Sequence, residues 1–429
     1  MPRTTQSTRL KSASIRHIGQ HKSPTWPDSH ERAHRIREPC AHQPSADNRG
    51  DWAVLDQLQI VKGRNDILIA ADGHEYVDLI AGFGALLLGH CREPIVERVR
   101  RQMDDVWLTG RLSVPVIAEA VDLVESRIGS PYRLVQFCSG GSEAVEFAIR
   151  IAAVTSGRKA FVGFSGSMHG KSVAASALCW GRQFVELQNL CTLPFVGTDP
   201  EAGILAQLER RLASNDVAAL FLELIQGSSG AHEASPAFYR RVGELCREHG
   251  TLCIVDEVLT GFYRSGALSF SREMGLSPDI LLFGKALGNG FPVAAVLCRA
   301  GIEITKPMLP GSTYSGNPLA AAAVAASLSE MTRLDVPSRT AMIHRTAMER
   351  LAPLREHGIA IRGRGALWVL ELPRGASALQ VQKTALSADV LVSVQGQYVR
   401  LLPPATISSE NLQHALGAVG DACLGSLNG

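Results

Sequence analysis

One lysine stands in the apolar stretch LLFGKALGNGFPVAAV, residues 281–296. An ammonium group in apolar surroundings costs free energy unless it is paired, neutralised or used in a covalent bond. Burial lowers the pKa of a lysine amine, and the neutral amine is the form that attacks a carbonyl carbon. Lys285 is therefore the first candidate for a reactive group.

Two further patterns stand where predicted strands end. Asp256 closes the apolar run LCIVD (252–256), and a carboxylate at such a place either caps a helix or binds something cationic. In CSGGSEAVE (138–146) a strand stops, two glycines follow, and a helix begins at about Ser142. The free N–H groups of a helix start bind anions, and glycine lets a phosphate approach closely. Each pattern is common when it occurs alone.

Taken together, the lysine, the aspartate and the anion cup predict a pyridoxal 5'-phosphate (PLP) site. That cofactor needs an amine for a Schiff base, a carboxylate that keeps its pyridinium nitrogen protonated, and donors for its phosphate. In open α/β sheets, ligands gather at the carboxyl ends of the strands, where all three features are expected. We predict no metal site.

The elements that must position these groups follow from the hydrophobic pattern. Amphipathic stretches, such as 142–155 and 236–250, alternate with short apolar runs. This alternation predicts an α/β fold with a largely parallel sheet covered on both faces. Two short strands are also expected around the Asp-Gly turn in 67–80, and a helix in 94–107. The apolar runs are 134–138, 160–164, 218–224, 252–256, 280–283 and 293–298.

We divide the chain into four parts. Residues 1–50 form a basic extension that we expect to be disordered, with a mitochondrial transit peptide as the alternative. Residues 51–93 are an N-terminal segment that packs with the small domain. Residues 94–335 form the large PLP-binding domain, and 336–429 form the C-terminal small domain, where the pattern changes to helix, strands and helix.

Composition narrows the class of protein. The chain has 429 residues, of which 45% are hydrophobic and 20% charged, which is typical of globular proteins. A net charge of +2 gives no reason to expect nucleic acid or an anionic membrane as partner, and no apolar run reaches the length of a membrane span. Nine cysteines without a C-x-x-C pair fit reduced thiols, so we expect a cytoplasmic protein.

Four motifs in this order resemble the class III (ornithine/ω-amino acid type) aminotransferases: DEVLTGFYRSG, FGKALGNGFPVAAV, GSTYSGNPLAAAA and YVRLLPP. The resemblance runs from about residue 55 to about residue 425. It implies the PLP-dependent transferase fold type I. In that fold, a large, mainly parallel-sheet domain is joined by a small α+β domain built from the C-terminal part and the N-terminal segment.

The resemblance also implies roles around the cofactor ring. Lys285 would form the internal aldimine and then move the proton between the substrate carbon and the cofactor carbon. Asp256 would pair with the pyridinium nitrogen, and Val258 would pack against one face of the ring. Gln226, in LELIQGSSG, would hydrogen-bond to the phenolic oxygen of the cofactor.

Further roles concern the phosphate, the substrate and the dimer. Gly141 and Ser142 would bind the phosphate, and Thr313 would reach the phosphate of the neighbouring subunit in a homodimer. Arg400 would hold a substrate carboxylate through two hydrogen bonds. His169 occupies the His-Gly turn of the family, where it either binds the cofactor or orders the loop.

The chain departs from the family pattern at three positions. Met168 replaces an aromatic residue that stacks on the cofactor ring; a thioether can cover the ring, but less rigidly. Gly140 replaces a serine or threonine of the phosphate cup. Ser228 replaces a glutamate thought to mask the carboxylate-binding arginine in ornithine-type enzymes. Without it Arg400 stays available, so we expect a less restricted ω-transaminase.

The predicted function is therefore transfer of an amino group from an amine or amino acid to a 2-oxo acid or aldehyde, through the Lys285 aldimine and a pyridoxamine intermediate. A PLP-dependent 1,2-aminomutase (glutamate-1-semialdehyde type) or racemase is the alternative within PLP enzymes. A non-catalytic protein of the same fold is the alternative from another class. The identities of the donor and acceptor do not follow from the sequence.

Overall fold

The computed structural model describes residues 54–110, 112–178 and 189–427, and the fold is that of the unit Ala46–Gly429. The predicted disordered extension, residues 1–50, lies outside the described residues, as does its transit-peptide alternative.

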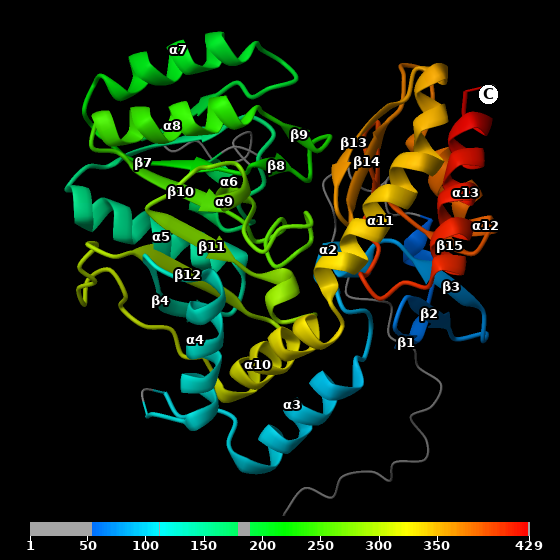
Figure 1. Cartoon of the computed structure of the whole chain (residues 1–429), viewed down its shortest axis with the longest axis horizontal. Helices are drawn as coiled ribbons and strands as arrows, with labels where there is room; N and C mark the ends of the chain where they lie inside the picture. Colours follow the sequence, from blue (N-terminus) through cyan, green and yellow to red (C-terminus); the bar gives the residue numbers. More distant parts are fainter. Residues whose placement is uncertain (1–53, 111, 179–188, 428–429) are drawn as a thin grey trace, which may run out of the picture. The chain divides into compact units, whose positions relative to one another are not determined.

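A seven-stranded sheet forms the centre of the larger part (Figure 1). Neighbouring strands run parallel, except that β12 is antiparallel to both of its neighbours. This confirms the predicted α/β class with a largely parallel sheet. The order is β4 (Tyr132–Cys138), β12 (Ala294–Arg299), β11 (Ile280–Phe283), β10 (Leu252–Asp256), β7 (Val217–Leu222), β5 (Ala160–Phe164) and β6 (Leu190–Leu193).

The apolar runs predicted these strands closely, with two differences. The run 218–224 was too long, because β7 ends at Leu222 and Glu223 lies beyond it. The edge strand β6 was not predicted, since its four residues, LCTL, include a polar threonine and three of them are only partly buried. The first difference matters because the carboxylate of Glu223, which the predicted strand would include, lies just after the carboxyl end of β7.

Helices cover both faces of this sheet. The side chains of α5 (Gly141–Ser156) pack with Phe221 and Ile254 on one face. On the other face, α8 (Pro236–Glu248) packs with the intervening strand residues and has α7 (Glu201–Leu212) beside it (Figure 1). The Ser235 side chain accepts from the Phe238 N–H at 3.1 Å and caps α8. Alternate strand residues thus serve opposite faces.

The remaining elements of this part connect or flank the sheet. The helices α3 (Glu93–Asp105), α4 (Pro115–Ile128) and α10 (Pro318–Arg333) pack together, which confirms the helix predicted in 94–107. The shorter elements are α2 (Ala81–Gly84), α6 (Val173–Ala177), β8 (Ile225–Gln226), β9 (His232–Glu233), α9 (Phe270–Glu273) and η2 (Lys285–Leu287). Before them comes η1 (Leu55–Gln57), whose Leu55 packs with Ala70, Tyr76 and Leu391 and not with the large sheet.

The C-terminal part has helices around two small sheets. One sheet has the order β13 (Ala360–Arg364), β14 (Leu367–Glu371), β17 (Tyr398–Leu401) and β16 (Ser393–Gln395). The helices and the 3-10 turn are α11 (Val336–Leu351), η3 (Ala352–His357), α12 (Ala378–Ser387) and α13 (Ser409–Gly425).

The second small sheet joins the two ends of the chain. Its strands are β1 (Ile60–Arg64), β2 (Ile67–Ala70), β3 (Glu75–Asp78) and β15 (Val390–Leu391), and β15 pairs parallel with β3 (Figure 1). The antiparallel pair β2–β3 confirms the two strands expected in 67–80. These contacts agree with the expected packing of the N-terminal segment, while the domain limits themselves stay a prediction.

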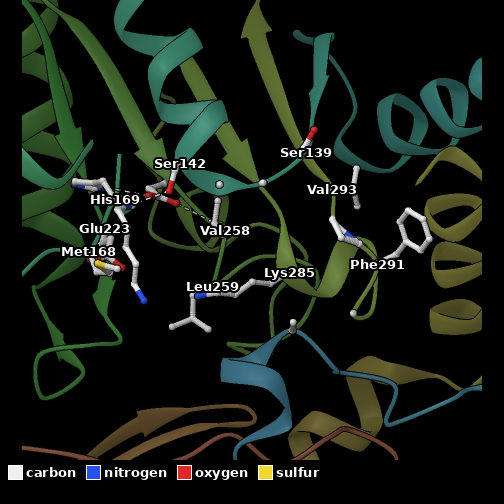
Figure 2. Close-up of a pocket in the computed structure, with 18 residues that line it drawn as sticks. Ser139, Ser142, Met168, His169, Glu223, Val258, Leu259, Lys285, Phe291 and Val293 are labelled. Carbon is white, nitrogen blue, oxygen red and sulfur yellow. Dashed lines mark hydrogen bonds and ion pairs between the residues drawn. The ribbon is translucent and has the colours of Figure 1, made fainter. Parts of the chain in front are cut away.

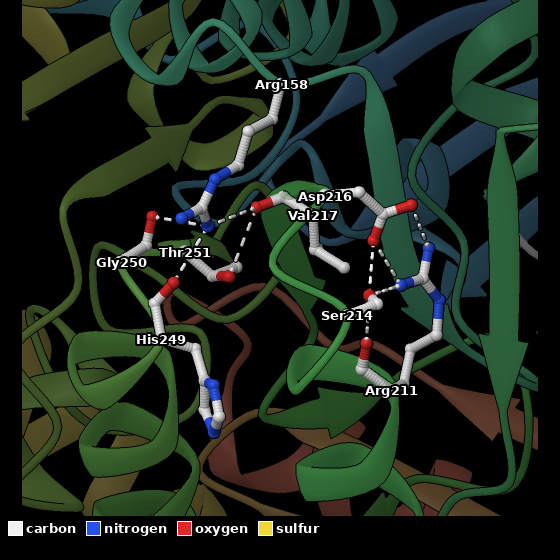
Figure 3. Close-up of polar contacts among 8 residues, drawn as sticks. All are labelled: Arg158, Arg211, Ser214, Asp216, Val217, His249, Gly250 and Thr251. Carbon is white, nitrogen blue, oxygen red and sulfur yellow. Dashed lines mark hydrogen bonds and ion pairs between the residues drawn. The ribbon is translucent and has the colours of Figure 1, made fainter.

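Arg158 holds two strands together where they begin (Figure 3). Its Nη1 donates to the carbonyl oxygens of Val217, His249 and Gly250 at 3.2, 2.8 and 3.0 Å, and Thr251 Oγ1 donates to the same Val217 oxygen at 3.2 Å. Val217 begins β7, and β10 follows Thr251 directly. Fixing these starts contributes to the alignment of the two strands at their opposite, carboxyl ends.

Arg264 links three distant segments in the interior. Its guanidinium is fully buried and donates to the carbonyl oxygens of Gly84, Ala366 and Pro403. Burial lowers the pKa of Arg264 to about 9, against the charge of Asp78, which acts to raise it. One cation therefore satisfies three backbone acceptors from different parts of the chain.

We predict that Arg264→Met lowers the free energy of unfolding by about 3 kcal/mol, because it leaves buried carbonyl oxygens without donors. Thermal denaturation followed by circular dichroism measures this effect. The control is Arg100→Met, at a largely exposed arginine with one ion pair, which should change stability by no more than about 0.5 kcal/mol. Equal effects of both substitutions would contradict the assignment.

Candidate active site

A cavity of about 360 Å³ lies at the carboxyl end of the large sheet (Figure 2). Met168, His169 and Glu223 stand on one side of it, Phe291 and Val293 on the other, and Lys285 between them. Its polar side chains follow five different strands, so only the folded chain assembles them. They are those of Ser139, Ser142, His169, Lys171, Glu223, Asp256 and Lys285.

Lys285 follows β11 after a single glycine and opens η2. Its φ of 43° lies in the left-handed region, which is strained for a residue with a side chain and is found at functional sites. Although the side chain borders the cavity, enough protein surrounds it that burial lowers the pKa of Lys285 to about 8. The charge of Arg400 lowers it further, while Glu223 and Asp256 act to raise it.

Asp256 ends β10 and is 5% exposed. Its Oδ1 accepts from the Val258 N–H at 3.0 Å, and its Oδ2 lies 2.9 Å from His169 Nδ1. These two contacts fix the plane of the carboxylate against the cavity, which Val258 also lines. A carboxylate has further lone pairs, so it can accept one more hydrogen bond from a ligand.

The start of α5 offers donors to an anion. Ser139, Gly140, Gly141 and Ser142 all line the cavity. Ser142 Oγ accepts from the Lys171 N–H at 3.0 Å, which leaves the hydroxyl proton of Ser142 free to be donated. A β-carbon built on Gly140 would meet no atom within 4 Å, so the missing serine or threonine side chain leaves open space in the cup.

The turn that carries Met168 and His169 packs closely on the same helix start. A β-carbon built on Gly170 would lie 2.4 Å from Ser142 Oγ, and the φ of Gly170 is 143°. His169 is 3% exposed, and its ring stands 5.7 Å from the ring of Phe221. The turn therefore connects the anion cup to Asp256: Gly170 packs against Ser142 at one end, and His169 is bonded to Asp256 at the other.

Glu223 is a site residue that the sequence analysis missed. It follows β7, is 5% exposed, and its Oε2 accepts from the Met168 N–H at 2.6 Å. Burial raises the pKa of Glu223 to about 7, against the charge of His169, which acts to lower it. The signal was present, since a carboxylate after an apolar strand was the same pattern that singled out Asp256.

Seven of the ten predicted site residues line the cavity: Gly141, Ser142, Met168, His169, Asp256, Val258 and Lys285. Gln226, Thr313 and Arg400 do not. Gln226 is buried, and its Nε2 donates to Ser165 O at 2.7 Å and to Ser167 Oγ at 3.2 Å. Thr313 is exposed on the loop before α10.

Arg400 lies on β17 and is 8% exposed. Its Nε has no hydrogen-bond partner, and the guanidinium makes no ion pair, among the residues that the structure describes. Burial lowers the pKa of Arg400, while the nearby charge of Glu223 acts to raise it. A buried cation without a bonded anion is costly, so this group fits an anionic ligand.

The groups around the cavity fit PLP. The start of α5 and the Ser142 hydroxyl provide donors for a phosphate, Asp256 provides a fixed carboxylate for a pyridinium nitrogen, and Lys285 provides an amine of lowered pKa. Together with the sheet order, this donor set defines a PLP-dependent transferase of fold type I.

Comparison with known proteins narrows this class further. The class-III aminotransferase family matches residues 50–423, and the chain belongs to that family. It is 34% identical to the acetylornithine aminotransferase of Methanopyrus kandleri over 85% of this chain and 94% of that protein. It is 29% identical to the 2-aminoadipate transaminase of Pseudomonas putida over 88% of this chain and 98% of that protein.

Solved structures agree with this family. The ornithine aminotransferase of Toxoplasma gondii has a TM-score of 0.78 and 28% identity, and the match covers 86% of this chain and 90% of that one. A PLP-bound amine transaminase from an uncultivated Pseudomonas species has a TM-score of 0.82 and 25% identity, covering 91% and 99%.

The predicted family, fold type, cofactor and reaction class are therefore confirmed. The protein is a PLP-dependent aminotransferase, and its substrates are a small-molecule amino donor and an oxo acceptor. The aminomutase, racemase and non-catalytic alternatives are not favoured. None of the described helices is both long and apolar enough to cross a membrane.

We predict that Gly170→Ala weakens PLP binding at least about tenfold, because the new methyl group displaces Ser142 and with it a donor to a charged group. Fluorescence titration of the cofactor-free protein measures the Kd. The control is Gly203→Ala in α7, where a β-carbon would meet no atom within 4 Å, and which should leave the Kd unchanged. Unchanged cofactor affinity in Gly170→Ala would show that the close packing on Ser142 is not needed.

Proposed function

We propose that the residues around the cavity divide the work of amino transfer as follows. When bound, PLP supplies an electron sink for the carbon that carries the substrate amine. Lys285 binds the cofactor through Nζ and, once released, takes up the proton from that carbon and returns it to a carbon of the cofactor. Asp256 holds the proton of the ring nitrogen, and its two existing hydrogen bonds keep it oriented. Val258 and Met168 cover the ring faces and exclude water.

The remaining proposed contacts are with the cofactor's oxygens. Gly141 and Ser142 donate to the phosphate, supported by their place at the start of α5. Gln226 serves the phenolic oxygen, although its Nε2 already donates to Ser165 O and to Ser167 Oγ, so this role requires that one of these bonds is given up or that the side chain rotates. His169 is bonded to Asp256 through Nδ1 and so orients that carboxylate. Of its two expected roles, this bond favours ordering of the loop over direct binding of the cofactor.

We propose a homodimer in which Thr313 reaches the phosphate of the neighbouring subunit. Thr313 is exposed and stands next to Tyr314, which is 66% exposed. Ser315 Oγ of the same loop donates to Glu143 Oε1 at 3.1 Å, and Glu143 Oε2 accepts from the Ser139 N–H at 2.6 Å. The exposed loop is thus anchored to the anion cup of its own subunit.

We also propose a cytoplasmic location, supported by the seven described cysteines, all of which are free thiols.

We propose that the acceptor is a 2-oxo acid whose carboxylate binds Arg400, and that the range of amino donors is broad. The observation that carries this proposal is the buried Arg400 guanidinium with no ion pair to a described residue. The half-buried Ser228, where ornithine-type enzymes have a masking glutamate, supplies no charge to compete. The named activities of the relatives give the donors to test first: N-acetylornithine, 2-aminoadipate, ornithine and a simple amine.

We predict that the cofactor-free protein captures PLP faster as the pH rises and that the rate levels off above about pH 8. The reason is that Lys285 reacts as the neutral amine, whose fraction grows through the lowered pKa of about 8 rather than through that of a free lysine. Stopped-flow absorbance on mixing with PLP measures the rate.

Lys285→Ala is the matched blank for this measurement. It should lose both the visible absorbance band of the bound cofactor and all aminotransferase turnover. Retention of the band and of turnover would reject the role of Lys285. A capture rate that still rises steeply at pH 10 would reject the lowered pKa.

We predict that Arg400→Ala raises the KM for 2-oxoglutarate about 100-fold, because two charged hydrogen bonds to a carboxylate are lost. Ser228→Glu should raise the same KM about tenfold by giving Arg400 a competing partner, whereas Ser228→Gln, of similar size and without charge, should change it little. Steady-state kinetics with pyruvate and 2-oxoglutarate across the donor panel measures these effects. Selective use of ornithine by the unmodified enzyme would contradict an unmasked Arg400.

A further inference from the structure

Glu223 and Asp256 lie side by side at the carboxyl ends of two neighbouring strands. Strands β7 and β10 are parallel, and their last register pair is Leu222 with Val255. The next residue in each segment is a buried carboxylate: Glu223 directly after β7, and Asp256 at the end of β10. Two carboxylates at adjacent buried positions repel each other unless a cation or a proton lies between or beside them.

His169 can supply the compensating charge when its ring is protonated. The imidazole is buried, its Nδ1 is bonded to Asp256, and its Nε2 has no hydrogen-bond partner in the described part of the chain. A second proton on this ring is therefore stabilised by nearby negative charge and not by a second hydrogen bond. Burial by itself lowers the pKa of His169, but the bond and charge of Asp256 and the charge of Glu223 outweigh it and raise the pKa.

Glu223 also fixes the backbone that carries the imidazole. Its Oε2 accepts from the N–H of Met168, the residue before His169, at 2.6 Å. Other charged groups that act on Glu223 are Asp256, Lys285 and Arg400. Of these neighbours, Asp256 opposes the ionised form of Glu223, while the cations favour it.

We propose that Glu223 is a positioning residue for amino transfer: its carboxylate holds the Met168–His169 turn through one hydrogen bond, and its negative charge keeps His169 protonated and bonded to Asp256. The protonated imidazole then holds Asp256 in the plane from which it meets the ring nitrogen of the cofactor. This inference rests on the proposed role of Asp256. The cavity holds a cluster of three ionisable side chains, those of Glu223, His169 and Asp256. The inference assigns a function to Glu223, the member of this cluster that has no role in the proposed function.

Two substitutions separate the hydrogen bond from the charge. In Glu223→Gln, the side-chain amide oxygen still accepts from the Met168 N–H, but the charge is gone. In Glu223→Ala, both are lost. Glu257→Gln is the matched control, because Glu257 is a buried carboxylate beside Asp256 whose oxygens are bonded to Ser269, Phe270 and Ser271, outside the cavity.

The first measurement is nitrogen-15 NMR of histidine-labelled, cofactor-free protein, with the His169 signals assigned through their loss in His169→Gln. We expect Glu223→Gln to lower the titration midpoint of His169 by about one pH unit, a tenfold loss of proton affinity. The loss should be greatest above about pH 7, because burial raises the pKa of Glu223 to about 7 and most molecules carry its charge only above that value. Glu257→Gln should leave the midpoint unchanged even if it lowers thermal stability.

The second measurement is the Kd of PLP together with the pH dependence of the absorbance of the bound cofactor. We expect Glu223→Gln to keep the Kd within about twofold and to shift the spectral midpoint, and Glu223→Ala to weaken binding at least about tenfold as the turn is released.

An unchanged His169 midpoint in Glu223→Gln would overturn the proposal, as would equal shifts in Glu223→Gln and Glu257→Gln. Because the NMR titration needs neither cofactor nor substrate, its failure is distinct from a failure of the proposed catalytic roles. Those roles would fail if Lys285→Ala kept its absorbance band and its turnover.

Discussion

The parallel register of β7, β10 and β11 is the constraint on which the site depends. It ends three strands at one edge, so that Glu223, Asp256 and Lys285 face one cavity although they are far apart in sequence. Bringing such charges together in the interior costs free energy unless each finds a partner. The large apolar core on both faces of the sheet stabilises an arrangement that the site residues alone would disfavour.

The cavity surrounds its amine and its carboxylate with different groups. Lys285 has a lowered pKa because it is buried and stands near Arg400, so its amine is available for a covalent bond near neutral pH. Asp256 is bonded to the Val258 N–H and to His169 Nδ1, which fix its orientation. The proposed roles use this contrast between an amine made reactive by burial and a carboxylate oriented by hydrogen bonds.

In the proposed function, Arg400 and Ser228 connect the fold to substrate choice. The guanidinium comes from β17 in the C-terminal sheet, whereas the other charges come from the large sheet. A residue on a different sheet can bind the end of a substrate that is distant from the cofactor without disturbing the cofactor contacts. The proposed preference for a 2-oxo acid acceptor therefore depends on how the C-terminal part packs, to which the buried Arg264 contributes through carbonyl oxygens of three segments.

The sequence by itself determined the fold class, most strands, the cofactor and the family, because apolar runs of strand length and short contiguous motifs are local signals. Lys285 and Asp256 stand out as charges in or after apolar runs, and seven of the ten predicted site residues line one cavity. Only the tertiary structure showed that β7 ends before Glu223, and that this carboxylate meets the Met168 turn beside Asp256. Likewise, it alone showed Arg400 buried without a bonded anion among the described residues, and Gln226 already bonded to Ser165. Strand register, burial and side-chain pairing depend on residues distant in the chain, so no local pattern specifies them.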